Sequence, residues 1–363
     1  MTKLRWGILG AASIARKNWK AFVNSGNGIV TALAARDVAR GEQFIRECLA
    51  QATFEPAPKV LGSYEQLLAS PDVDAVYLPL PTVVRKEWVI RAAQAGKHVF
   101  SEKPCAVNAA DLREMLAVCR KHRVQFMDGV MFMHSDRLAL MRRALDERVG
   151  PIKRISSQFS FLAQPEFMTS NIRASSDLEP LGALGDLGWY DIRFTLWAMN
   201  YQLPTHVTAR TLTAGKRPDA SGDVPLEFSA EMWFPGGTTA SFYCSFLTQI
   251  QQWANISGTT GCLQVNDFVV PSFGCEVAFE MIVSNLDRMG CDYNMPRRST
   301  RIASPEYSNN HPTAQETGMF RRFSSIVLNG RLEPEWEKIA LATQKVVNAC
   351  FESAKNDGKK ISL

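Results

Sequence analysis

The feature that most constrains the fold is a repeated alternation of short apolar runs and helix-like segments across the first 128 residues. Strands are expected at residues 5–9, 30–35, 75–80, 98–101 and 125–127. This order is typical of a doubly wound α/β domain, in which helices cover a parallel sheet. The chain has 363 residues, which exceeds the usual size of one hydrophobic core. We therefore expect a nucleotide-binding domain at residues 1–128 and a second domain at residues 129–363.

Local signals place several helix ends in the first half. Ser63 opens a capping box, and Asn108 is placed to cap a helix that runs to about residue 122. Gly96 follows a helical segment at residues 82–95. A helix is also expected at residues 11–24, directly after the first strand.

The pattern changes after Gly150 and Pro151, where alternating strands with turns replace the apolar runs. Strands are expected at residues 151–162, 227–234, 238–246, 252–257 and 262–265, which predicts a mostly antiparallel sheet. Helices are expected at residues 136–148, 313–328 and 335–355, and the last one can pack back on the first domain. The stretch 285–312, which carries several arginines, reads as a mobile or solvated loop or as an oligomer contact.

Composition narrows the class of protein. Hydrophobic residues make up 46% of the chain, and its net charge of +5 comes from interspersed basic and acidic residues, so nucleic acid is not implied. No apolar stretch approaches the ~20 residues that span a bilayer. The basic start followed by an apolar run could imitate a secretory signal, but a first strand and a glycine turn explain it better. Eight cysteines without a C-x-x-C pair indicate mostly reduced core residues in a cytoplasmic protein.

A candidate phosphate-binding turn follows the first strand. Its residues are Gly10, Ala11, Ala12, Ser13 and Ile14. In the G-x-G-x-x-G/A dinucleotide pattern, Ala12 stands at the second glycine, so the motif is degenerate and a plain strand turn remains open. Free N–H groups at the start of the following helix would bind phosphate with any small residue there.

The choice of nucleotide depends on the end of the second strand. Arg36 follows the strand, no acidic residue precedes it, and Arg40 lies one helical turn further on. These arginines favour the 2′-phosphate of NADP. Asp37 leaves NAD open, unless it caps the next helix and Arg36 is only a solvated residue.

Glu102, Lys103 and Pro104 form the second candidate motif. They follow the strand at residues 98–101, and ligands of open α/β sheets bind at the carboxyl ends of the strands. Lys103 is therefore a functional candidate, although Glu102 and Lys103 could also be an ordinary surface pair.

Asp186 and Tyr190 lie four residues apart and would share one face of a helix. A tyrosine has an ordinary pKa near 10, so proton exchange at neutral pH needs a nearby cation, which Lys103 could supply. The alternative is a buried tyrosine bonded to a carboxylate.

Other candidates carry weaker signals. His134 could face the cleft, although a lone histidine is more often structural. Arg173 could bind a hydroxyl-rich or anionic substrate, and Trp189 could stack on a sugar but is better explained by packing. The five histidines show no H-E-x-x-H pattern or close pairing, and no G-x-S-x-G elbow occurs, so we expect neither a metal site nor serine-based acyl transfer.

Together, these motifs resemble the Gfo/Idh/MocA oxidoreductases. The shared features are the Gly10 turn, Glu102-Lys103-Pro104, Asp128-Gly129 and the Gly-Asp-x-Gly-x-Tyr sequence at residues 185–190. Within the family, the chain is similar to the branch with dimeric dihydrodiol dehydrogenases, D-xylose dehydrogenases and plant-type oxidoreductases. It departs from the family where Arg85 replaces a frequent histidine, after Leu80 and Pro81, and where Phe132 replaces a frequent tryptophan.

The resemblance implies a Rossmann domain followed by a domain with a large open sheet. It also implies an NAD(P)-dependent enzyme that transfers hydride between the nicotinamide and a secondary alcohol or carbonyl of a sugar, polyol or dihydrodiol. Tyr190 would be the acid/base, assisted by Lys103 and Asp186, and Leu80, Pro81 and Glu102 would lie at the cofactor edge. The alternative is a catalytically silent NAD(P) sensor. A homodimer is expected through the sheet, whose exposed face would form a large apolar patch.

Overall fold

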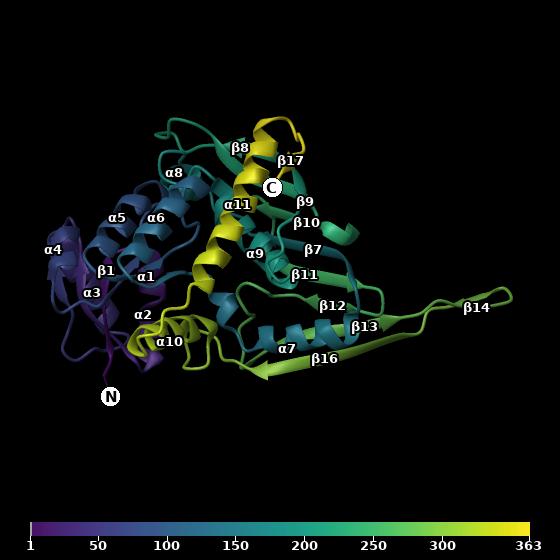
Figure 1. Cartoon of the computed structure of the whole chain (residues 1–363), viewed down its shortest axis with the longest axis horizontal. Helices are drawn as coiled ribbons and strands as arrows, with labels where there is room; N and C mark the ends of the chain where they lie inside the picture. Colours follow the sequence, from purple (N-terminus) through teal and green to yellow (C-terminus); the bar gives the residue numbers. More distant parts are fainter. Residues whose placement is uncertain (1) are drawn as a thin grey trace.

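The computed structural model describes residues 2–363, which form two sheets joined by the two last helices (Figure 1). The first sheet has six parallel strands in the order β3-β2-β1-β4-β5-β6. Their bounds are β1 Leu4–Leu9, β2 Gly28–Ala34, β3 Lys59–Leu61, β4 Ala75–Leu78, β5 His98–Ser101 and β6 Phe126–Asp128. The sequence prediction of a doubly wound parallel sheet is confirmed, although the short strand β3 was not foreseen.

Six helices connect these strands, and their caps follow the local sequence. They are α1 Ser13–Lys17, α2 Trp19–Ser25, α3 Val38–Leu49, α4 Tyr64–Ala69, α5 Thr82–Gln94 and α6 Ala109–Lys121. The Ser63 side chain accepts a hydrogen bond from the N–H of Gln66, and the Asn108 side chain accepts one from the N–H of Asp111. Both predicted caps are therefore confirmed.

The second sheet has nine strands in the order β16-β13-β12-β11-β7-β10-β9-β8-β17. Its strands are β7 Ile152–Ser160, β8 His206–Gly215, β9 Val224–Trp233, β10 Thr239–Ser245, β11 Gln251–Gly258, β12 Cys262–Val265, β13 Glu276–Ser284, β16 Arg297–Pro305 and β17 Ile361–Ser362. All neighbours pair antiparallel except β7 and β10, which run parallel. The predicted mostly antiparallel sheet is confirmed.

Helices cover only one face of this sheet. α7 Arg137–Ala144 packs on β13 and β16, α9 Trp189–Ala198 on β7 and β10, and α11 Glu335–Lys355 on β8. On the other face, Arg154 of β7 donates to Glu231 of β9 and Ser241 of β10. The expectation of a large apolar patch on this face is therefore wrong, because polar side chains of neighbouring strands pair across it.

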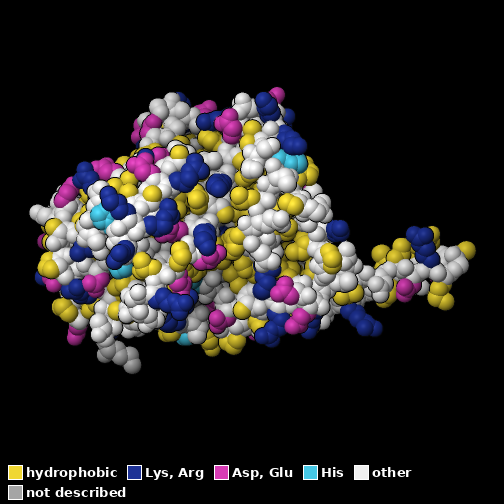
Figure 2. Space-filling model, viewed as in Figure 1, with side chains coloured by type: hydrophobic (Ala, Val, Ile, Leu, Met, Phe, Trp, Pro, Cys, Tyr) yellow, Lys and Arg dark blue, Asp and Glu magenta, His cyan; other side chains and the backbone are white. Residues whose placement is uncertain are grey.

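The stretch expected to be an irregular loop is instead a long β arm. β13 and β16 pair over their full length, and the arm ends in a small hairpin of β14 Asp287–Met289 and β15 Asp292–Asn294. Figures 1 and 2 show this hairpin projecting from the body of the molecule. The prediction was wrong because most side chains from Asn285 to Thr300 are exposed, so no apolar period marks the strands.

The last helices return to the first half of the chain. In α10 Gln315–Leu328, the rings of Phe320 and Phe323 pack within 5.9 Å and 5.0 Å of the Trp6 ring in β1. α11 runs between the two halves in Figure 1, and its Thr343 accepts a hydrogen bond of 2.6 Å from Arg193 of α9. Arg193 also forms a fully buried ion pair of 2.6 Å with Asp128 at the end of β6. This contact ties the first sheet to α9 and α11.

The remaining helical elements are short. They are 3-10 helices at Met131–His134, Ile172–Ala174 and Pro235–Gly237, π-helices at Leu145–Val149 and Leu184–Gly188, and α8 Phe167–Ser170. Within residues 2–363, no helix is long and apolar enough to cross a membrane.

Candidate active site

A cavity of about 230 Å³ lies where the carboxyl ends of β4, β5 and β6 meet the second half of the chain. The first half contributes Ile14, Leu80, Arg85, Glu102, Lys103 and Gly129 to its wall, and the second half contributes Arg173, Asp186, Tyr190, Val269 and Val270. The cavity therefore lies at the sheet edge at which open α/β sheets bind ligands.

The glycine turn between β1 and α1 has the backbone form that a phosphate cradle needs. Gly10 has a φ of +102°, which a residue with a side chain rarely adopts, and a Cβ there would lie 3.2 Å from the Tyr64 hydroxyl. Ala12 precedes α1 and has no side-chain cap, so the first N–H groups of the helix face a ligand without competition. These residues fit the pyrophosphate of a dinucleotide.

The residues after β2 are arranged as the NADP hypothesis requires. The Asp37 side chain accepts a hydrogen bond of 3.1 Å from the Arg40 N–H and so caps α3. Arg36 and Arg40 are exposed. Burial raises the pKa of the Tyr64 phenol beside the glycine turn, and the Arg36 charge partly offsets this increase. The Arg36 guanidinium therefore lies close enough to the glycine turn to influence the Tyr64 phenol.

Asp186 pairs with two of the cations in the cavity wall, Lys103 and Arg173. Its carboxylate lies 2.7 Å from Lys103 Nζ and 2.8 Å from Arg173 Nε, and Lys103 also donates to the Asp186 carbonyl oxygen. Burial alone would raise the pKa of Asp186, but the charges of Arg173 and Lys103 outweigh it and lower the pKa. Asp186 is therefore an anion that fixes the position of Lys103.

Lys103 lies against the face of the Tyr190 ring. Its Nζ is 4.6 Å from the ring centroid, in a cation–π arrangement. Burial lowers the pKa of Lys103, and the Asp186 charge opposes this decrease. The sequence prediction that these side chains share one pocket is confirmed.

Tyr190 is a buried phenol in this arrangement. Its hydroxyl contacts Met131 Sδ at 3.6 Å, and its ring lies 6.3 Å from Phe132 and 5.6 Å from Phe159. Burial, with smaller contributions from the Glu102 and Asp186 charges, raises its pKa well above 10. Lys103 therefore does not lower the pKa of the Tyr190 phenol, contrary to the expectation from the sequence.

Two further buried groups shape the floor of the cavity. Glu102 accepts a hydrogen bond of 2.5 Å from Tyr77, whose hydroxyl also accepts one of 3.0 Å from Asn18. The Arg85 guanidinium donates to the carbonyl oxygens of Leu80 and Pro104. Arg85 thus holds the loops after β4 and β5 together.

Two of the three substrate-binding candidates, His134 and Trp189, do not reach the cavity. The predicted cofactor residues that lie outside its wall are Gly10, Ala11, Ala12, Ser13, Arg36, Arg40 and Pro81. His134 is half-buried, stacks on Trp336 with ring centroids 4.9 Å apart, and is absent from the cavity wall. The expectation that it faces the cleft is wrong, because the turn at Met131–His134 directs it toward α11. Trp189 is fully buried and serves packing, as the sequence analysis preferred.

Residues 2–363 contain no group of three or more His, Cys, Asp or Glu side chains placed to hold a metal ion. The eight cysteines are free of disulfides, and five of them are buried.

Comparison with known proteins agrees with this geometry. Residues 4–130 match the family described as "Oxidoreductase family, NAD-binding Rossmann fold", and residues 138–264 match the Gfo/Idh/MocA C-terminal domain. A trans-1,2-dihydrobenzene-1,2-diol dehydrogenase from Bos taurus is 30% identical over 73% of this chain and 74% of its own length. The chain belongs to the Gfo/Idh/MocA oxidoreductase family. It is accordingly an NAD(P)-binding dehydrogenase or reductase.

Other relatives in the Gfo/Idh/MocA family have names that describe reactions on nucleotide sugars. A dTDP-3,4-didehydro-2,6-dideoxy-alpha-D-glucose 3-reductase from Saccharopolyspora spinosa is 31% identical over 74% of this chain and 76% of its own length. A solved structure of a 3-ketoreductase from Actinomadura kijaniata, in complex with NADP and TDP-benzene, superposes with a TM-score of 0.81. It is 27% identical and covers 97% of this chain and 98% of its own.

Several wall residues of this Gfo/Idh/MocA site escaped the sequence analysis. They are Lys17, Asn18, Met131, Phe159, Phe161, Glu179, Val269, Val270 and Met319. Glu179 accepts hydrogen bonds from the Thr82 N–H and hydroxyl and so ties the second half to the start of α5. No local motif marks these residues. In the sequence, only the length of the loops near β7 and β12 indicates that these segments could line a substrate cavity.

Proposed function

We propose that this protein is an NADP-dependent dehydrogenase or reductase that acts on a secondary alcohol or carbonyl of a sugar, polyol or dihydrodiol. The observation that carries the proposal is the convergence of Lys103, Asp186 and Tyr190 in one cavity at the carboxyl edge of the first sheet. The names of the relatives, which act on a dihydrodiol and on a deoxysugar, support the class of substrate.

In this proposal, the cofactor supplies the hydride chemistry, and the protein positions the substrate oxygen and moves a proton. Tyr190 exchanges the proton with the substrate oxygen. Lys103 stabilises the negative charge that develops on that oxygen or on the phenol. Asp186 holds Lys103 in place. Arg173 pairs with the same carboxylate through Nε, and a substrate hydroxyl can reach the other guanidinium nitrogens of Arg173.

In the reductive direction, Tyr190 is the proton donor of this proposal. Burial keeps the phenol protonated, and a protonated phenol is the form that can donate to the oxygen of a ketone during reduction. Oxidation of an alcohol would need the phenolate, which the buried site disfavours in the absence of a bound positive charge.

The preference for NADP rests on Arg36 and Arg40. Both are exposed near the glycine turn, and the carboxylate that could repel a 2′-phosphate is held at the cap of α3. We also propose that the protein is cytoplasmic and forms a homodimer through the open face of the second sheet. The polar pairs on that face would then meet their symmetric copies in an isologous contact.

Single substitutions test the catalytic roles. Tyr190→Phe and Lys103→Met should each lower kcat by about 10²- to 10⁴-fold, because each removes proton transfer or its electrostatic support. Cofactor affinity, measured by NADPH fluorescence, should stay within a few-fold of the unaltered protein. Tyr293→Phe, at the exposed tip of the arm, is the matched control.

Turnover near the normal rate in both site variants would refute the assignment. A screen of aldoses, polyols, dihydrodiols and ketosugars that yields no NADPH absorbance change, despite tight cofactor binding, would favour the silent sensor instead.

A further inference from the structure

Glu102 is a nearly buried carboxylate in the wall of the reaction cavity. It is 8% exposed and lines the cavity together with Lys103 and Tyr190. Acidic side chains are buried this deeply mainly where a cation pairs with them. Glu102, however, forms no ion pair with any residue in the described range 2–363. Its negative charge therefore has no direct counter-ion among these residues.

The cations of the cavity wall are engaged elsewhere. They are Lys17, Arg85, Lys103 and Arg173. Lys17 pairs with Glu316 at 3.0 Å, and both Lys103 and Arg173 pair with Asp186. The Arg85 guanidinium donates to backbone carbonyl oxygens. None of the four is thus committed to Glu102.

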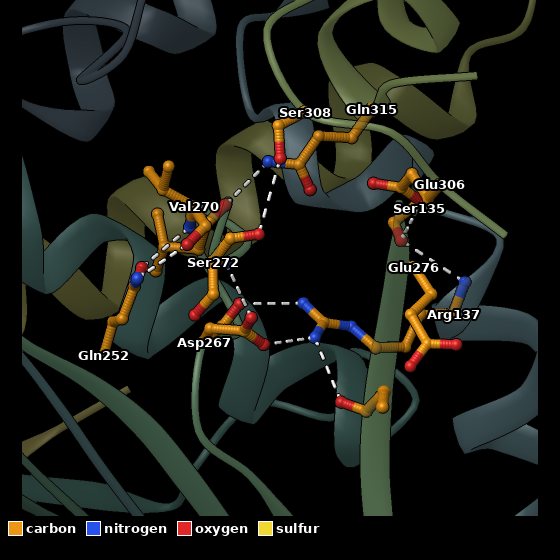
Figure 3. Close-up of polar contacts among 12 residues, drawn as sticks. Ser135, Arg137, Gln252, Asp267, Val270, Ser272, Glu276, Glu306, Ser308 and Gln315 are labelled. Atoms are coloured by element: carbon orange, nitrogen blue, oxygen red, sulfur yellow. Dashed lines mark hydrogen bonds and ion pairs between the residues drawn. The ribbon is translucent and has the colours of Figure 1, made fainter. Parts of the chain in front are cut away.

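The segment after β12 adds no charge to the cavity either. It contributes Val269 and Val270, whose side chains are apolar. Gln252 fixes the backbone of Val270, because its Nε2 donates to the Val270 carbonyl oxygen at 2.6 Å and its Oε1 accepts from the Val270 N–H at 2.8 Å (Figure 3). Asp267 of the same segment pairs with Arg137 outside the cavity wall (Figure 3). This wall therefore leaves the Glu102 charge as it is.

One oxygen of Glu102 is fixed, and the other is free. Oε1 accepts a hydrogen bond of 2.5 Å from the Tyr77 hydroxyl, which itself accepts one of 3.0 Å from Asn18. Oε2 accepts no hydrogen bond within residues 2–363, and it is not fully enclosed, so a ligand in the cavity can meet it. Gly129 leaves room for this oxygen, because a Cβ there would lie 3.1 Å from it.

The charge of Glu102 acts on the groups of the reaction. Burial raises the pKa of the Tyr190 phenol, and the Glu102 charge adds to this increase. Burial lowers the pKa of Lys103, and the charges of Asp186 and Glu102 oppose this decrease. Glu102 therefore contributes to the electrostatic potential at the place where we propose that hydride and proton are exchanged.

The cofactor carries one charge that changes in such a reaction, because the nicotinamide ring is a cation in NADP⁺ and neutral in NADPH. Ile14, in the first turn of α1, lines the reaction cavity, so a dinucleotide held at the glycine turn would extend into it. A carboxylate in the protein interior attracts a cationic ring and acts much less on a neutral one, because charges are screened less there than in water.

We propose that Glu102 makes the protein bind NADP⁺ more tightly, relative to NADPH, than it would with a neutral residue at this position. The inference rests on the proposed function, because it places the nicotinamide ring in the reaction cavity. When a carbonyl is reduced, hydride leaves NADPH, Tyr190 gives its proton to the substrate oxygen, and NADP⁺ remains. Glu102 stabilises that oxidised product and so favours hydride transfer to the substrate.

Equilibrium binding tests the inference without turnover. The Kd of NADPH is measured by its fluorescence, and the Kd of NADP⁺ by competition against NADPH. Glu102→Gln replaces the carboxylate with a neutral amide of the same size, whose oxygen can still accept from Tyr77. It should raise the ratio of the Kd of NADP⁺ to the Kd of NADPH about tenfold, which corresponds to about 1.4 kcal/mol.

Two further variants and a control complete the test. Glu102→Ala should raise the ratio as Glu102→Gln does, so either variant suffices if the other does not fold. Glu102→Asp keeps the charge and should keep most of the original ratio. Glu335→Gln, at an exposed carboxylate on α11, is the control and should leave both dissociation constants unchanged.

Equal weakening of both forms in Glu102→Gln would mean that Glu102 binds a group common to NADP⁺ and NADPH, such as a ribose hydroxyl, and would overturn the inference. An unchanged ratio with normal affinities would overturn it as well. A raised ratio in a protein that turns over no sugar, polyol or dihydrodiol would support the inference and count against the proposed function alone. If the unaltered protein bound neither form, both would fail.

Discussion

The two sheets of this protein differ in how much of their architecture is visible in the sequence. In the first sheet, helices cover both faces, and the strands are continuous apolar runs such as Ala75–Leu78, which is buried at every position. In the second sheet, helices cover one face, and strands such as β9 alternate buried and partly exposed residues. In the hairpin of β14 and β15 at the tip of the arm, every residue is exposed, and the periodicity disappears. A strand can therefore be predicted from the sequence where at least one of its faces is buried, because burial, and not strand geometry itself, creates the apolar pattern.

The first half of the chain does not form its hydrophobic core alone. The first half takes part of its core from the C-terminal helix α10, whose Phe320 and Phe323 pack on Trp6. The division at residue 128 therefore separates the sheets but not the cores.

The largest effect on stability is expected at the seam between the two halves, which is the buried ion pair of Asp128 and Arg193. Arg193→Leu leaves Asp128 buried without its partner, and breaking such a pair costs about 3–5 kcal/mol of unfolding free energy. Urea denaturation should show this loss. Arg210→Leu, which removes an exposed pair with Asp357, is the control and should cost less than about 1 kcal/mol. Equal effects of the two substitutions would mean that the seam contributes no more than a surface contact.

The half-buried His134, whose Nε2 is enclosed without a partner in the described residues, predicts a pH-dependent stability. Burial lowers its pKa to about 3, so between pH 6.5 and 3 only the unfolded chain binds the proton at this residue. Its contribution to stability therefore falls by about 1.4 kcal/mol for each pH unit of acidification in this window. His134→Phe should remove that slope, whereas the exposed His311→Phe should leave it. An unchanged slope in His134→Phe would show that the imidazole is hydrated in solution.

A smaller effect is expected for the cofactor preference. Arg36→Ala removes charge-assisted hydrogen bonds worth about 1.5–3 kcal/mol, so the preference for NADP over NAD should fall about 10- to 100-fold. Michaelis constants for both cofactors measure it. Arg46→Ala, at an exposed arginine on the following helix α3, is the control. A preference for NAD that neither substitution alters would identify Arg36 as a plain surface residue.

The smallest effect is expected at the tip of the arm. Met289 is 71% exposed, so Met289→Ser should change the unfolding free energy by less than about 0.5 kcal/mol. Phe279→Ser, at a buried position of β13 in the same arm, should cost several kcal/mol. Sedimentation of Met289→Ser also distinguishes two candidate dimer contacts, the open face of the second sheet and the arm. The dimer of this variant should persist if the open sheet face mediates assembly, and it should dissociate if the arm does.

The candidate site was predictable to the extent that its residues follow strand ends or share a helix face. Gly10 and Lys103 lie directly after strands, and Asp186 and Tyr190 are one helical turn apart, so local spacing places them together. Arg173 reaches the cavity from a loop, and only its ion pair with Asp186 explains why. Val269 and Val270 reach it because Gln252 and Gln315 hold their backbone from distant elements.

The sequence by itself determined the parallel sheet, its glycine turn and the convergence of Lys103, Asp186 and Tyr190, because burial on both faces and spacing along one strand or helix are local properties. Only the tertiary structure decided how deeply Tyr190 is buried, where His134 points, and which loop residues complete the wall of the reaction cavity. These depend on the burial and charges that several distant segments create together, and no local period in the chain records them.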